Sequence, residues 1–137
     1  MSRRTTIFVI AALLSVGSAS YAQPNKKQYK LQERCGELAK QKFIQDWGAN
    51  GFVNIANGRI WANYENHYNA RLNKCFYLEG RRLERRKHNK INMLRLFDLN
   101  ENKEYASFNK GAMCEVRGKK CHSQLEWVEL IKPYMEE

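Results

Sequence analysis

The chain of 137 residues is 28% charged and 43% hydrophobic, and its 24 Lys and Arg against 14 Asp and Glu give a formal net charge of +10. This length suits a single domain. The composition excludes both a disordered tail and a bundle of membrane helices.

The first 22 residues show the three parts of a secretory signal peptide. Two arginines precede an apolar stretch at residues 7–16, and Ser20 and Ala22 place small side chains at positions −3 and −1 of a cleavage site. The apolar stretch has about half of the roughly 20 residues that a transmembrane helix needs. We therefore expect cleavage after Ala22, which leaves a single mature domain, residues 23–137. This domain is expected to be periplasmic or secreted in a bacterium and to have no transmembrane span.

Residues 26–47 are predicted to form an amphipathic helix. Leu31, Cys35, Ala39 and Phe43 recur every four residues, which places them on one side of a helix, and the residues between them are mostly polar. A sequence rich in Gly and Asn follows, and it predicts the end of the helix.

Apolar and polar residues then alternate over several short segments, as they do in half-buried strands. Polar tips separate these segments, so consecutive strands should pair in an antiparallel sheet of three to five strands. The predicted strands are residues 59–67, 75–83, 91–99, 104–108 and 113–116.

A second helix is predicted at the C-terminal end of the chain. Ser123 and Glu126 have the spacing of a capping box, which satisfies free backbone N–H groups at the start of a helix. Pro133 is expected to end or bend this helix. The predicted fold class is therefore α+β, with an N-terminal and a C-terminal helix packed on an antiparallel sheet.

Four cysteines, an even number, predict two disulfides in an oxidising compartment. Of the three possible pairings we favour Cys35–Cys75, which would tie the first helix to the sheet, and Cys114–Cys121, which would close a short loop that reverses at Gly118. No C-x-x-C pair occurs, which argues against a structural metal site. Disulfide-bonded sulfurs also leave no thiol for catalysis, and we expect neither a metal nor a cofactor.

The residue inventory argues against several reaction classes. The predicted mature chain has no Thr and only two Ser, and it lacks the G-x-S-x-G and G-x-x-x-x-G-K motifs of serine hydrolases and nucleotide-binding loops. Glu65 and His67 would share one face of a strand, which is the kind of pair that general acid–base catalysis uses. A small hydrolase or lyase built on this pair is one alternative, and a structural His67 held by its neighbours is the other.

Residues 81–90, called the basic hairpin below, carry six positive charges, and a second basic cluster lies in the predicted disulfide loop. A local field of this sign attracts polyanions, and guanidinium groups suit bidentate contacts with phosphate or carboxylate. The candidate anion-binding residues are Arg81, Arg82, Arg85, Arg86, Lys87, Lys119 and Lys120.

Export limits the partners of these residues to anionic lipid, anionic glycan or an envelope protein. Export and the lack of a recognition motif argue against nucleic acid. The favoured function is thus a non-enzymatic exported binding module that contacts anionic envelope components through the basic hairpin. Two alternatives stay open. The hairpin can be solvated, with charges that only keep an edge strand from pairing with neighbouring molecules, or the whole protein can be a purely structural envelope protein.

Two segments carry a resemblance to a known group of proteins. His67–Phe76, HYNARLNKCF, and Lys132–Glu136, KPYME, are similar to segments of small exported bacterial proteins of unknown function. The resemblance covers about the last two-thirds of the chain. It implies export and the joint presence of Cys75 and the terminal helix, and it implies no activity.

Overall fold

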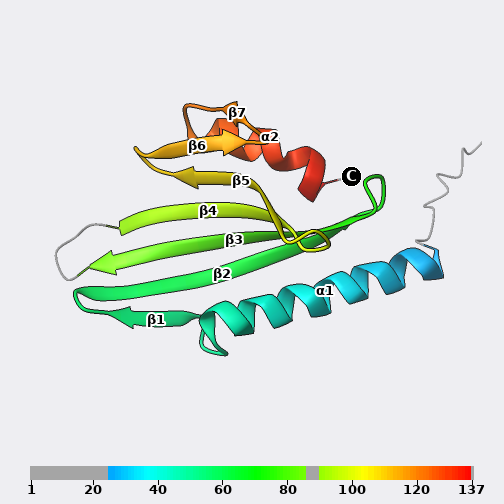
Figure 1. The fold of residues 1–137 in the computed structure, drawn as a ribbon, viewed down its shortest axis with the longest axis horizontal. Helices are drawn as coiled ribbons and strands as arrows, with labels where there is room; N and C mark the ends of the chain where they lie inside the picture. The colour runs from blue at the N-terminus through cyan, green and yellow to red at the C-terminus, as the bar shows by residue number, and fades with distance from the viewer. Residues whose placement is uncertain (1–24, 86–89, 137) are drawn as a thin grey trace, which may run out of the picture.

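The computed structural model of the protein describes residues 25–85 and 90–136, so the predicted signal peptide lies outside the described residues, as do Arg86 and Lys87 of the basic hairpin. Figure 1 shows the arrangement of the helices and the sheet. The elements of the described residues are α1 (Lys26–Trp47), β1 (Phe52–Ile55), β2 (Gly58–Asn69), β3 (Lys74–Arg85), β4 (Lys90–Asp98), β5 (Lys103–Asn109), β6 (Met113–Val116), β7 (Lys119–Lys120) and α2 (Gln124–Met135).

The sheet of the described residues is a meander of seven antiparallel strands, in which each strand pairs with the next along the chain. The α+β class and the antiparallel pairing are confirmed, but the predicted number of three to five strands is too low. The additional strands, β1 and β7, have four and two residues and lie at the two edges of the sheet. Segments this short show no alternation that could identify them, and only their hydrogen bonds to β2 and β6 make them strands.

Strands β2 and β3 have 12 residues each and pair along their whole length. In the turn that joins them, Asn69 Oδ1 accepts a hydrogen bond from the backbone N–H of Leu72 at 2.9 Å, and Asn73 adopts a left-handed conformation with φ 52°. The amide group of Asn69 also donates to the backbone carbonyl of Pro133 in α2, at 3.0 Å. The segments His67–Phe76 and Lys132–Glu136 therefore meet in space.

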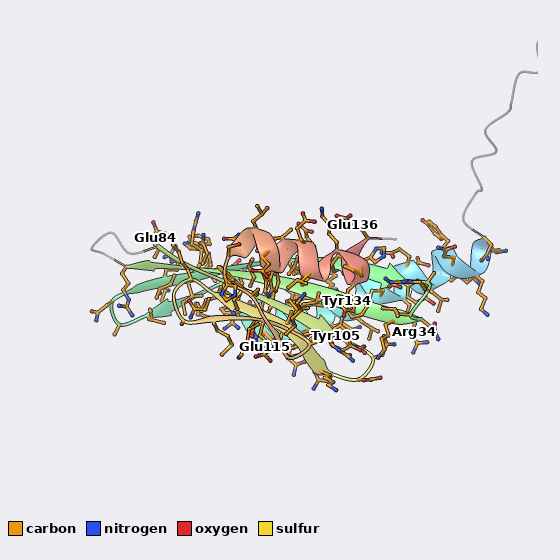
Figure 2. All side chains as sticks on the ribbon, turned by 90° about the horizontal axis from the view of Figure 1, so that it is seen from above. Arg34, Glu84, Tyr105, Glu115, Tyr134 and Glu136 are labelled. Carbon is orange, nitrogen blue, oxygen red and sulfur yellow. A yellow bond between two sulfur atoms is a disulfide. The ribbon has the colours of Figure 1, made fainter. Side chains whose placement is uncertain are left out.

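The two helices pack on opposite faces of the sheet, because neighbouring residues of a strand point to opposite sides. On one face, Tyr77 of β3 packs with Ala39 of α1 and Phe97 of β4. On the other face, the ring of Phe76 lies 5.3 Å from that of Tyr134 in α2, and Figure 2 shows α2 along this side of the sheet. The larger hydrophobic core lies under α2 and contains Phe76, Leu96, Tyr105, Ala106, Phe108, Val116, Cys121, Trp127 and Ile131.

The ends of the helices follow the sequence signals, with one exception. α1 spans Lys26–Trp47, as predicted. At the start of α2, Ser123 Oγ accepts a hydrogen bond from the backbone N–H of Glu126, as predicted, and the Glu126 carboxylate accepts one from the backbone N–H of His122, one residue before the cap. Of the two outcomes predicted for Pro133, an end or a bend, the end does not occur, because Pro133 lies inside α2, which continues to Met135. No helix of the described residues combines the length and the apolarity needed to cross a membrane.

Both disulfides have the predicted pairing. Cys35–Cys75 joins α1 to β3, and Cys114–Cys121 joins β6 to the residue after β7. The sulfurs of the first pair are buried beside Tyr68. None of the four cysteines is free, so the oxidised protein offers no thiol for nucleophilic or metal chemistry.

Candidate functional site

Residues 81–85 of the basic hairpin belong to β3, so their side chains alternate between the two faces of the sheet. Arg81 points to the α1 side, where its Nε lies 2.8 Å from Oε1 of Glu79 and its guanidinium lies over the ring of Trp47. The Glu79 side chain is only 3% exposed. Arg81 therefore neutralises a buried carboxylate inside the protein and is engaged before any ligand arrives.

Glu79 is the centre of a polar cluster between α1 and the sheet. Its Oε2 accepts a hydrogen bond of 2.8 Å from the indole N–H of Trp47, and Arg95 approaches Oε1 to 4.0 Å. The neighbouring Tyr77 is fully buried, and burial, followed by the charge of Glu79, raises the pKa of its hydroxyl, which stays protonated at neutral pH. These contacts fasten the end of α1 to the sheet.

Arg82 and Arg85 have no acidic partner among residues 25–85 and 90–136, and both are exposed. Arg82 points to the α2 side and lies opposite Trp61 of β2. Arg85 is the last residue of β3, at the same end of the molecule, and by the same alternation its side chain points to the α1 side. Glu84 lies between them in sequence, and its carboxylate accepts a hydrogen bond from the indole N–H of Trp61. Figure 2 shows Glu84 toward one end of the molecule and Arg34 toward the other.

The second predicted basic cluster is at a different place on the sheet. Lys119 and Lys120 form β7, the edge strand opposite β1, and Lys120 pairs with Glu115 of β6. Four strand spacings of about 4.8 Å put β7 roughly 19 Å from β3. The fold therefore does not bring these lysines together with the arginines of β3.

Glu65 and His67 do share one face of β2, as predicted, but no hydrogen bond joins them within the described part of the chain. Glu65 is exposed, whereas Nε2 of His67 is buried and has no hydrogen-bond partner among the described residues. A carboxylate that does not hold the imidazole cannot orient it for proton transfer. The arrangement thus gives no support to an enzyme built on this pair.

An open groove of about 350 Å³ lies beside Arg82, on the same face as α2. Its floor is Gly80 of β3, which pairs with Asn63 of β2 and Leu94 of β4. A Cβ atom on Gly80 would lie 2.4 Å from Oδ1 of Asn63, so a side chain here would displace the Asn63 amide and fill the floor. We call this feature the Gly80 groove; its polar and aromatic walls are Trp61, Asn63, Arg82, Asn92 and Gln124.

The indole of Trp61 is held in place by three neighbours. Besides the hydrogen bond to Glu84, its ring lies 5.0 Å from that of Phe52 in β1, and the guanidinium of Arg59 lies 5.1 Å from its centroid. Arg59 in turn donates to the side chain of Asn54. The aromatic wall of the groove is therefore held by contacts from β1, β2 and β3 before a ligand binds.

No family model, no curated protein and no solved structure matches this chain. Its function must therefore be argued from its own groups. Among the described residues, no three His, Cys, Asp or Glu side chains form a cluster that could hold a metal ion.

Sequence analysis missed most of the groove. It assigned no binding role to Trp61, Asn63, Gly80, Asn92 or Gln124. A glycine inside a strand was the available signal, because it often marks a close approach of a ligand or of another chain segment.

Proposed function

We propose that the protein is an exported, non-enzymatic binding module. It holds an anionic component of the cell envelope near the C-terminal end of strand β3. The observation that carries the proposal is the pair of exposed arginines, Arg82 and Arg85, which lack acidic partners among the described residues. The signal-peptide pattern and the net positive charge support the location and the sign of the ligand.

The chemistry of the two side chains suits this role. A guanidinium is always charged and presents a planar fork that matches carboxylate, phosphate or sulfate. Of the neighbouring acids, Glu79 is paired with Arg81, and the Glu84 carboxylate accepts a hydrogen bond from Trp61. Arg86 and Lys87 follow Arg85 in the sequence and would add to the same field.

Replacing Arg82 and Arg85 together by serine is expected to weaken binding to immobilised heparin. Each charge-assisted hydrogen bond contributes about 1.5–3 kcal/mol, so a loss of roughly tenfold or more follows. The measurement is the affinity of residues 23–137 at two salt concentrations, and the variant should also show a smaller dependence on salt.

The matched control is Lys30→Ser with Arg34→Ser. These two exposed residues of α1 also lack an acidic partner among the described residues, and their loss changes the net charge by the same amount at the other end of the molecule. If the control variant loses as much affinity as the arginine variant, net charge alone explains retention, and the proposed site is wrong.

A further inference from the structure

We infer that the Gly80 groove binds one or two rings of an acidic saccharide, with Arg82 holding the acid group. The inference rests on the proposed function and narrows it to one chemical class of ligand. The volume of about 350 Å³ lies at the low end of the roughly 300–1,000 Å³ typical of small-ligand sites. This size suits a short segment of a sugar chain.

Three amide side chains without partners give the groove its chemical character. Asn63, Asn92 and Gln124 come from β2, β4 and α2, and none of their side chains forms a hydrogen bond within the described residues. Each amide presents donors and an acceptor. Sugar hydroxyls also donate and accept, so they can satisfy both ends of an amide, whereas phosphate oxygens at neutral pH accept and leave the amide carbonyls unmatched.

Apolar surface in the groove favours a sugar ring over a bare anion. The indole of Trp61 and the side chain of Leu94 lie at the groove, and the C–H face of a sugar ring can cover such surface. Because Phe52, Arg59 and Glu84 already fix the indole, little conformational freedom is lost when a ligand packs against it.

The balance of charge sets how acidic the ligand is. Arg82 is the unpaired cation among the described residues of the groove, since the side chain of the adjacent Arg81 points to the α1 side and is paired with Glu79. One guanidinium beside three neutral amides matches one carboxylate on a ring rich in hydroxyls. A chain of uronic acid units has this composition.

The test compares three soluble probes by titration calorimetry on residues 23–137 at one ionic strength. The probes are hexagalacturonate, the neutral sugar maltohexaose, and linear hexaphosphate. We expect hexagalacturonate to bind at least tenfold more tightly than either of the others. Equal or tighter binding of hexaphosphate overturns the inference.

Variants in the groove then locate the binding. Gln124→Ala and Asn92→Ala, both at exposed positions, are each expected to weaken hexagalacturonate binding several-fold, and Gly80→Ala at least tenfold because it displaces the Asn63 amide. The control is Gln45→Ala, which removes an exposed amide without a described partner from α1. Far-ultraviolet circular dichroism checks that each variant is folded.

The outcomes separate the inference from the proposed function. If the arginine variant loses heparin binding but Gln124→Ala and Asn92→Ala bind hexagalacturonate like the parent protein, the anion site stands and the saccharide groove is wrong. If neither hexagalacturonate nor hexaphosphate binds, and heparin retention does not depend on Arg82 and Arg85, both fail. Loss in the groove variants with Gln45→Ala unchanged supports the inference.

Discussion

Replacing Cys35 and Cys75 together by serine is expected to lower the free energy of unfolding of residues 23–137 by about 4 kcal/mol. The two cysteines are separated by 40 residues, so the disulfide closes a long loop and strongly restricts the unfolded chain. It also clamps α1, whose contacts are chiefly with β2 and β3, onto the sheet. A loss of this size corresponds to a decrease of roughly 15 °C in the melting temperature of a domain of this length.

The matched comparison is Cys114→Ser with Cys121→Ser. This pair spans only seven residues, and the same entropy argument gives a loss of about 2 kcal/mol. Urea unfolding followed by tryptophan fluorescence measures both. Equal losses in the two double variants would show that loop closure does not set the contribution of these disulfides.

The second large effect is expected for Asp98→Ala, which should destabilise the protein by about 3–5 kcal/mol. The Asp98 side chain is fully buried at the end of β4. One carboxylate oxygen pairs with the ammonium of Lys74, and the other accepts hydrogen bonds from the backbone N–H groups of Asn100 and Glu101 at 2.9 and 3.3 Å. Its removal leaves the Lys74 charge and two backbone donors without this partner.

Asp98→Asn separates these contributions, because the amide keeps an oxygen for the two backbone donors but loses the negative charge. Its stability is expected to lie between that of the parent protein and that of Asp98→Ala. Thermal unfolding at neutral pH measures the order. An Asp98→Asn variant as unstable as Asp98→Ala would assign the effect to the ion pair alone.

The same ion pair predicts a dependence on alkaline pH. Hydrogen bonds to Asp98 and then to Glu101 raise the pKa of Lys74 above its ordinary value. The unfolded chain therefore loses this proton at lower pH than the folded protein does. The stabilisation by the Lys74–Asp98 ion pair is fully present below about pH 10.4 and is lost as the pH rises above that value. The free energies of unfolding of the parent protein and of Asp98→Asn should therefore converge as the pH rises further.

Much of the fold follows from the order of apolar residues in the sequence. The four-residue spacing from Leu31 to Phe43 identified α1, and alternation identified β3 and β4. The number and spacing of the cysteines led to the observed disulfide pairing. β1 and β7 were missed because a strand of two to four residues is defined by its partner, which the local sequence does not name.

The candidate site was predicted less completely. The basic hairpin was treated as one surface, although a strand turns Arg81 and Arg82 to opposite faces, and this alternation was visible in the sequence. The groove could not be found in the same way. Asn63, Gly80 and Leu94 belong to three strands, and only the register of the sheet places them side by side.

The order of the cysteines along the chain has a consequence for how the oxidised protein forms. Cys35 is linked to the next cysteine, Cys75, and Cys114 to the one after it, Cys121. An oxidant that joins each cysteine to the next free one along the chain would produce the native set directly. Maturation of this protein would then require an oxidase and no disulfide isomerase.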